Sequence, residues 1–234
     1  MIRTLIAHAD DNMVLAQRLG EWVSRAPELE LDIALANLGL DHLGVARALY
    51  QRAAELEGDG KTEDDYAMWR DERQFTNLLL VEQPNGDFAH TIVRQFLFDA
   101  YQLQLWEDLA ANADDEVLRG VAAKAIKEAR YHFRFSSGWM VRLGDGTDES
   151  HRRAQDALAD LWRFTAEMFE DPATASYREA WDGIVAEVLE DATLEIPDDP
   201  YQRSGGRQGF HTEHLGRLLA EMQWLARSHP GAKW

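Results

Sequence analysis

Apolar residues recur every three or four positions over long parts of this chain, which is the spacing of one face of an α-helix. The pattern predicts seven helices, and the breaks between them fall at clusters such as Gly58-Asp59-Gly60 and Pro84-Asn85-Gly86. We find no alternation typical of a β-strand. The predicted helices cover residues 3–25, 29–57, 87–112, 115–143, 148–169, 174–194 and 211–227.

The order of these helices predicts an all-α, ferritin-like four-helix bundle. Short turns near Pro27 and Asp114 join the first helix to the second and the third to the fourth, while residues 58–86 form a long connection. Two antiparallel hairpins joined by a crossover are typical of that fold. We therefore expect a single domain over residues 1–234, with a core bundle over about residues 3–143 and three accessory helices over about residues 148–227.

Each of the four bundle helices places polar residues inside its apolar stripe. In the third helix, for example, Asp99 fills the vacant position between Phe96 and Leu103. The stripe predicted for the fourth helix consists of Leu118, Val121, Ala125, Phe135, Trp139 and Leu143. The polar residues that we expect to be buried at the level of a metal site are Asn12, Asp41, His42, Asp99, Glu128 and His132.

Two interpretations of these buried polar residues are open. Di-iron carboxylate proteins use four carboxylates and two histidines, each histidine three residues after a glutamate. Here Gly44 and Tyr131 occupy the two histidine positions, and Asn12 is neutral where a carboxylate is required. The spacing therefore favours an internal network of hydrogen bonds and ion pairs without a metal. The alternative is that the chain is itself a di-metal carboxylate oxidase or oxygenase.

Composition excludes several classes of protein. The 234 residues are 45% apolar, and 42 acidic against 24 basic residues give a net charge of −18, which repels nucleic acids and anionic membranes. The absence of cysteine excludes disulfides, thiolate zinc sites and iron–sulfur clusters, and it fits a reducing, cytoplasmic location. No apolar run approaches the length of about 20 residues that spans a membrane.

Three further motifs each have two possible interpretations. His211 and His214 have a spacing that can bind zinc, but they also suit the polar start of a helix. The loop over residues 203–209 offers two arginines and three glycines to an anion, or it is an ordinary connector. A basic stripe on the fourth helix is either a solvated face or a contact for an acidic partner or ligand, and it comprises Lys124, Lys127, Arg130 and Arg134.

Long strings of this sequence resemble the C subunits of the bacterial ring-1,2-phenylacetyl-CoA monooxygenases, also called phenylacetyl-CoA epoxidases. The resemblance extends over essentially the whole chain. The strings that carry it are LGEW at 19–22, APELE at 26–30, RDERQF at 70–75, NLLLVEQPNG at 77–86, KEARYH at 127–132 and HTEHLG at 211–216.

The resemblance implies a structural, ferritin-like subunit of phenylacetate catabolism that pairs with a homologous catalytic A subunit. In that family the A subunit holds the di-iron centre and the CoA thioester. The complex inserts one oxygen atom from O2 into the aromatic ring, with electrons that a separate reductase delivers from NADPH. For this chain the resemblance implies no catalytic residue, no resident metal and no cofactor.

The apolar composition of the third predicted helix indicates that the chain associates with another protein. Apolar residues lie nearly all round this helix, so it must be covered on more than one side. Its apolar residues are Phe96, Leu97, Phe98, Tyr101, Leu103, Leu105 and Trp106. We expect the chain to form a homodimer when alone and to bind the catalytic subunit when both are present. The alternative is a self-contained seven-helix monomer.

Overall fold

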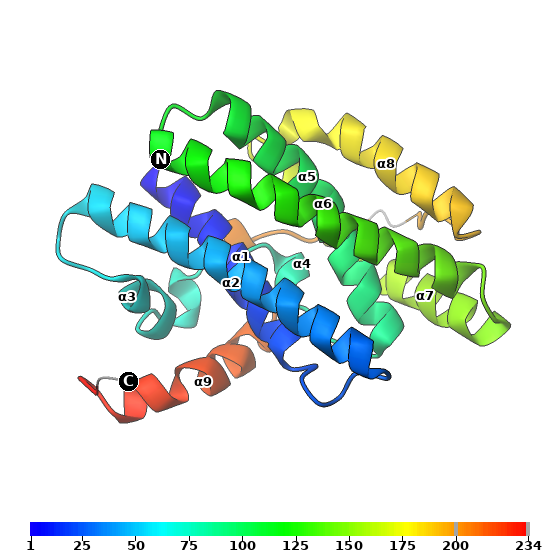
Figure 1. Cartoon of the computed structure of the whole chain (residues 1–234), viewed down its shortest axis with the longest axis horizontal. Coiled ribbons are helices and arrows are strands. Elements are labelled where there is room, and N and C mark those ends of the chain that lie inside the picture. Colours follow the sequence, from blue (N-terminus) through cyan, green and yellow to red (C-terminus); the bar gives the residue numbers. More distant parts are fainter. Residues whose placement is uncertain (199–200, 233–234) are drawn as a thin grey trace. The chain divides into compact units, whose positions relative to one another are not determined.

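The computed structural model describes residues 1–198 and 201–232, and these residues form helices with no strand among them (Figure 1). The all-α fold class predicted from the sequence is confirmed. Contacts divide the chain into two compact units, which we call the first unit (Met1–Pro84 with Gly205–Trp234) and the second unit (Asn85–Ser204). A single domain over the whole chain stays a prediction.

The first unit is built on an antiparallel pair of long helices. Asp10 meets Tyr50 and Asn12 meets His42, so residue numbers rise on one helix as they fall on the other. The C-terminal helix α9 packs on α1 and α3. The elements are α1 (Ile2–Gly20), α2 (Leu29–Glu57), α3 (Glu63–Met68), the 3-10 turn η1 (Glu72–Gln74), α4 (Leu79–Glu82), the 3-10 turn η4 (Gly206–Gln208) and α9 (Glu213–Ser228).

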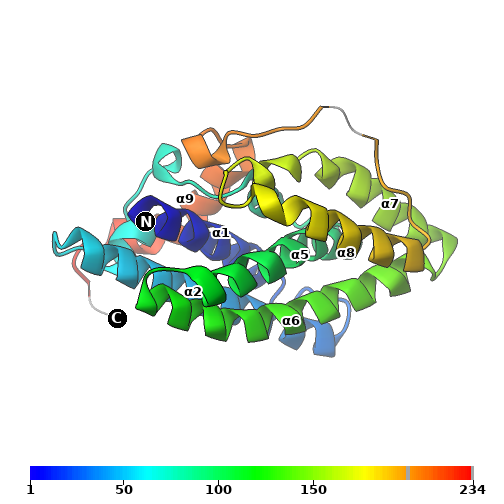
Figure 2. The same ribbon diagram turned by 90° about the horizontal axis from the view of Figure 1, so that it is seen from above.

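The second unit contains the other long antiparallel pair, α5 and α6. Asp99 of α5 meets Ser136 of α6, and Glu107 meets Arg130 further along. Helices α7 and α8 both pack against this pair (Figure 2). The elements are α5 (Phe88–Asn112), α6 (Glu116–Gly144), α7 (Asp148–Trp162), the 3-10 turns η2 (Ala166–Phe169) and η3 (Ala175–Tyr177), and α8 (Arg178–Asp191).

Side-chain caps explain where several helices begin. The carboxylates of Asp87 and Asp115 accept hydrogen bonds from backbone N–H groups in the first turns of α5 and α6, and Thr147 does the same for α7. At the other end of α2, Gly58 adopts a left-handed φ of 69°, which a residue with a side chain adopts only with strain. The starts of these helices were therefore predictable to within about two residues.

Some element ends differ from the prediction. Helix α1 ends at Gly20 instead of near residue 25, because glycine is a poor helix former and Ser24 takes a positive φ of 68°. Helix α7 ends at Trp162 instead of residue 169, where the Thr165 hydroxyl donates to the Trp162 carbonyl and competes with the helix ladder. The short helices α3 and α4 lie within the predicted connection over residues 58–86.

The apolar sides of α5 are covered within the chain. Phe96, Leu97 and Phe98 are each 0% exposed, and Tyr101, Leu105 and Trp106 are at most 2% exposed. Rings of the accessory segments provide part of this cover: Tyr101 packs on Phe169 and Tyr177, and the Trp181 Nε1 donates to the Leu97 carbonyl at 3.0 Å. Leu103, the remaining residue of the predicted set, is half-buried, so the apolar composition of α5 does not by itself require a partner.

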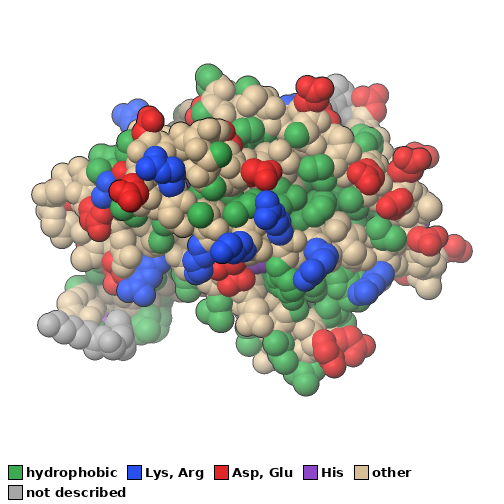
Figure 3. Space-filling view, turned by 45° about the horizontal axis from the view of Figure 1, so that its top comes forward, with side chains coloured by type: hydrophobic (Ala, Val, Ile, Leu, Met, Phe, Trp, Pro, Cys, Tyr) green, Lys and Arg blue, Asp and Glu red, His purple; other side chains and the backbone are tan. Residues whose placement is uncertain are grey.

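The buried face of α6 also differs from the predicted stripe. Leu118 and Ala125 of that stripe are buried, but Phe135, Trp139 and Leu143 are only half-buried, and the small residues Ala122, Ala129 and Ser136 are buried instead. Small side chains let two helices approach closely, so the large rings are displaced to the edge of the contact. The face drawn in Figure 3 shows Lys and Arg side chains beside apolar ones. None of the described helices has a stretch long and apolar enough to cross a bilayer.

Candidate functional site

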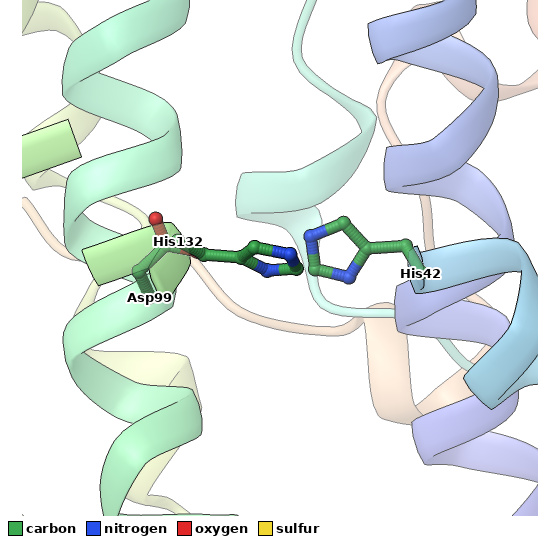
Figure 4. A group of neighbouring side chains, drawn as sticks. All are labelled: His42, Asp99 and His132. Atoms are coloured by element: carbon green, nitrogen blue, oxygen red, sulfur yellow. The ribbon is translucent and has the colours of Figure 1, made fainter. Parts of the chain in front are cut away.

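In the first unit, Asn12 of α1 and His42 of α2 form a buried pair. The Asn12 Nδ2 donates to the His8 carbonyl at 2.8 Å, so its Oδ1 faces the His42 Nδ1 at 2.7 Å. An amide oxygen only accepts, and therefore His42 carries a proton on Nδ1. The pair thereby fixes the tautomer and the orientation of the His42 imidazole, which is 1% exposed. Figure 4 shows this ring on α2.

In the second unit, Asp99 of α5 and His132 of α6 are both buried, and Figure 4 labels both. A carboxylate oxygen of Asp99 and a ring nitrogen of His132 lie within 4.8 Å of each other. Asp99 accepts hydrogen bonds from the Gln95 Nε2 at 2.6 Å and the Ser136 hydroxyl at 2.7 Å. Burial raises the pKa of Asp99 to about 8, and these two neutral donors lower it only in part. At neutral pH this carboxyl is therefore mostly uncharged.

The other two predicted residues are not fully buried. Asp41 is half-buried, because it precedes His42 by one residue and so lies about 100° round the helix from the buried face. The Glu128 side chain is 19% exposed, with Lys124 at 3.2 Å one turn earlier on α6. Gly44 and Tyr131, at the two positions where di-iron proteins have histidine, are exposed. Of the six predicted residues, the structure buries Asn12, His42, Asp99 and His132.

Two buried carboxylates that pattern reasoning did not select, Asp10 and Asp11 of α1, each accept several hydrogen bonds. Asp10 is 0% exposed and accepts hydrogen bonds from the Tyr50 hydroxyl at 2.5 Å, the Thr76 N–H at 2.7 Å and the Arg70 guanidinium. Burial and the neighbouring Asp10 carboxylate raise the pKa of the Tyr50 hydroxyl well above its usual value, so Tyr50 stays a donor. Because Tyr50 is a neutral donor, the charge of the Asp10 carboxylate is balanced by the Arg70 guanidinium, with which it forms an ion pair.

Asp11 is neutralised by the other arginine that reaches α1. Both oxygens of Asp11 accept from the Arg207 guanidinium, at 2.9 and 2.7 Å, and one also accepts from the Leu78 N–H at 2.7 Å. Burial raises the pKa of Asp11, but the charge of Arg207 and hydrogen bonds from His8 and Arg207 outweigh it, so the net pKa is lowered. Asp11 therefore stays ionised in the folded chain.

A third buried carboxylate, Glu82, holds the C-terminal segment. It accepts from the Thr212 N–H at 2.6 Å, and its other oxygen lies 2.8 Å from the His211 Nδ1. The His211 Nε2 lies 2.9 Å from the Phe75 carbonyl, so both ring nitrogens face acceptors and the imidazole is a cation. Burial alone lowers the pKa of His211, but Glu82 and the Phe75 carbonyl raise it above its usual value. Glu82 and His211 form an internal ion pair.

A family model described as phenylacetic acid catabolic protein matches residues 1–234. The chain belongs to this family. It is 52% identical over 240 residues to the protein named as the C subunit of 1,2-phenylacetyl-CoA epoxidase in Escherichia coli (strain K12), a match that covers 96% of this chain and 95% of that relative. The resemblance inferred from the sequence strings is confirmed.

In this member of the phenylacetic acid catabolic family, two of the open motifs have internal partners. Both ring nitrogens of His211 are engaged by Glu82 and Phe75, so His211 has no nitrogen available to bind zinc together with His214. Thr212 caps α9, as expected for the polar start of a helix. The loop over residues 203–209 does bind an anion through Arg207, and that anion is the Asp11 carboxylate of the same chain.

The carboxylates that the long helices bury, on α1 in the first unit and on α5 in the second, are neutralised within the chain. Among the described residues these helices bury three carboxylates, Asp10, Asp11 and Asp99. Two are neutralised by Arg70 and Arg207, and the third is mostly protonated at neutral pH. A di-iron site needs four carboxylates to balance the charge of its metals.

Proposed function

We propose that this chain is the C subunit of a bacterial 1,2-phenylacetyl-CoA epoxidase of phenylacetate catabolism, and that its role in the complex is structural. Identity of 52% over nearly the full length of both chains supports the first part. The structural role rests on one observation: the buried carboxylates are either paired with cations of the same chain or protonated.

The carboxylates carry the argument because catalysis by a di-metal centre needs anionic ligands that are free to bind metal. In this chain Arg70, Arg207 and His211 bind Asp10, Asp11 and Glu82, while burial keeps Asp99 protonated. These contacts tie α1 to the segments over residues 70–84 and 205–215 within the first unit. The groups therefore act in folding and in presenting a rigid surface.

The proposal assigns the chemistry to a separate catalytic A subunit. That partner would hold the di-iron centre and add an oxygen atom from O2 to the ring of phenylacetyl-CoA with electrons from NADPH. This chain would carry no cofactor, form a homodimer when alone and reside in the cytoplasm with its partner.

Sedimentation and turnover test the proposal together. The purified chain is run alone, and then mixed with the catalytic subunit encoded in the same genome, while ring oxygenation of phenylacetyl-CoA is measured with the reductase and NADPH. We expect a dimer in the first run, a complex in the second, and turnover only when the catalytic subunit is present. Turnover by this chain alone, or no complex in the mixture, would refute the proposal.

A further inference from the structure

The outward face of α6 carries a hollow that no described part of the chain fills. Its volume is about 200 Å³, and it is open to solvent. The lining comes from a few turns of one helix, so the hollow lies entirely within the second unit. The residues that line it are Tyr131, Arg134, Phe135, Gly138, Trp139 and Arg142.

The hollow exists because Gly138 has no side chain. A Cβ at this position would meet no atom within 4 Å. On one side the Arg134 guanidinium lies over the Tyr131 ring, 5.5 Å from its centroid, and on the other the Arg142 guanidinium lies over the Trp139 ring at 5.0 Å. Eight residues separate the arginines, which is about 12 Å along a helix. Gly138 is midway between them.

These two guanidiniums are held in place but have no anion. Among the described residues, neither Arg134 nor Arg142 forms an ion pair, although the chain has 42 acidic residues. Cation–π stacking fixes a guanidinium while leaving its N–H edges able to donate. Nearby, Lys124, Lys127 and Arg130 are also exposed on α6. Lys124 pairs with Glu128 and Arg130 with Glu107, so the excess positive charge of this face comes from the remaining cations, in a chain of net charge −18.

The exposed rings give this face an apolar component as well. Tyr131 is 44% exposed, and Phe135 and Trp139 are half-buried. Fixed aromatic and arginine side chains around a pocket are the groups that dominate binding energy at protein interfaces. By contrast, most of the large apolar residues of α5 are buried, and Leu103 and Leu109 are half-buried.

We propose that this face of α6 docks an acidic segment of the catalytic partner. An apolar side chain of that segment enters the hollow over Gly138, and carboxylates on either side of it pair with Arg134 and Arg142. The proposal rests on the proposed function, because it places the partner there. A second copy of this chain is a poor occupant in a two-fold pairing, since it would bring two basic faces together.

Two kinds of variant test the proposal against matched controls. Gly138→Leu fills the hollow, and its control is Gly183→Leu on α8, an exposed helical glycine that likewise has no atom within 4 Å of its Cβ. The double variant Arg134→Glu with Arg142→Glu reverses the charge. Its control is Arg152→Glu with Arg217→Glu, two exposed arginines on α7 and α9, which changes the net charge by the same amount.

The measurement is the Kd between each purified variant and the catalytic subunit, at low and at high salt. We expect Gly138→Leu and the Arg134/Arg142 double variant to weaken binding by at least about tenfold, and both controls to change it by less than about twofold. Thermal unfolding of Gly138→Leu should stay at or above that of the wild type, since leucine is the better helix former.

Each other outcome overturns the proposal in a distinct way. Unchanged binding by Gly138→Leu would show that the hollow receives nothing. Equal losses in the two double variants would show that only net charge matters. If Gly138→Leu or the Arg134/Arg142 double variant no longer forms a homodimer but still binds the catalytic subunit, the face belongs to the contact with a second copy of this chain. If the wild type does not bind the catalytic subunit at all, the proposed function fails together with this surface.

Discussion

Asp99 gives the sharpest test of how the buried carboxyls are arranged. Its pKa is raised from 3.8 to about 8 by burial, and the Gln95 and Ser136 side chains that donate to it are neutral. Asp99→Asn keeps the shape of the side chain and removes the titration. The Ser136 hydroxyl can accommodate the new amide group by rotating its own proton toward the Phe133 carbonyl, 3.3 Å away.

The magnitude follows from proton linkage. Between pH 3.8 and about 8 the folded chain keeps the Asp99 proton and the unfolded chain has lost it. More protons are bound in the folded state, so the free energy of unfolding falls as pH rises, by about 1.4 kcal/mol per pH unit. Asp99→Asn lacks this slope. Relative to the wild type, the variant should therefore gain about 3 kcal/mol between pH 5 and pH 7.

Urea denaturation of the wild type and the variant at pH 5, 6 and 7 measures this difference directly, because other titrating groups cancel in it. Asp160→Asn, at an exposed position on α7, is the matched control for the loss of one carboxyl group. A stability difference for Asp99→Asn that does not change with pH would refute the reasoning, since it would mean that Asp99 is ionised in the folded chain.

Two further predictions concern the ion pairs of the first unit. Arg207→Ala leaves the Asp11 carboxylate buried without its cation and should lower the free energy of unfolding by about 3 to 5 kcal/mol. The control, Arg203→Ala at an exposed position, should change it by less than about 0.5 kcal/mol. Equal losses in the two variants would refute the pairing of Arg207 with Asp11. His211→Gln should destabilise the chain most below pH 6.5, where His211 is charged in both states, and this loss should shrink as pH rises through the raised folded pKa. Thermal unfolding at pH 6 and pH 9 checks it, and a loss that grows with pH would contradict a charged His211.

Helical periodicity was enough to predict the long helices, because each buries a stripe against an antiparallel neighbour. It failed where local chemistry ends a helix early, as at Gly20 and Thr165. It also misplaced the buried face of α6, since packing there depends on small residues that a hydrophobicity pattern undervalues. The half-buried Phe135 and Trp139 are the result.

For the candidate site, the pattern identified which positions turn inward but not how their charges are balanced. Asp99 was expected within a network of ion pairs, and the structure gives it neutral donors. Asp10 and Asp11 were missed as a site because their cations, Arg70 and Arg207, lie about 60 and 196 residues away along the chain. Spacing within a helix cannot indicate such distant partners.

The most direct test of the structural role is the iron content of the purified chain. The chain is loaded with ferrous iron under anaerobic conditions, desalted and assayed, with the catalytic subunit treated in parallel as the positive control. Because Arg70 and Arg207 neutralise two of the buried carboxylates and Asp99 is protonated, we expect far less than one iron per chain. Two tightly held irons per chain, with the absorption band of an oxo bridge, would contradict the account.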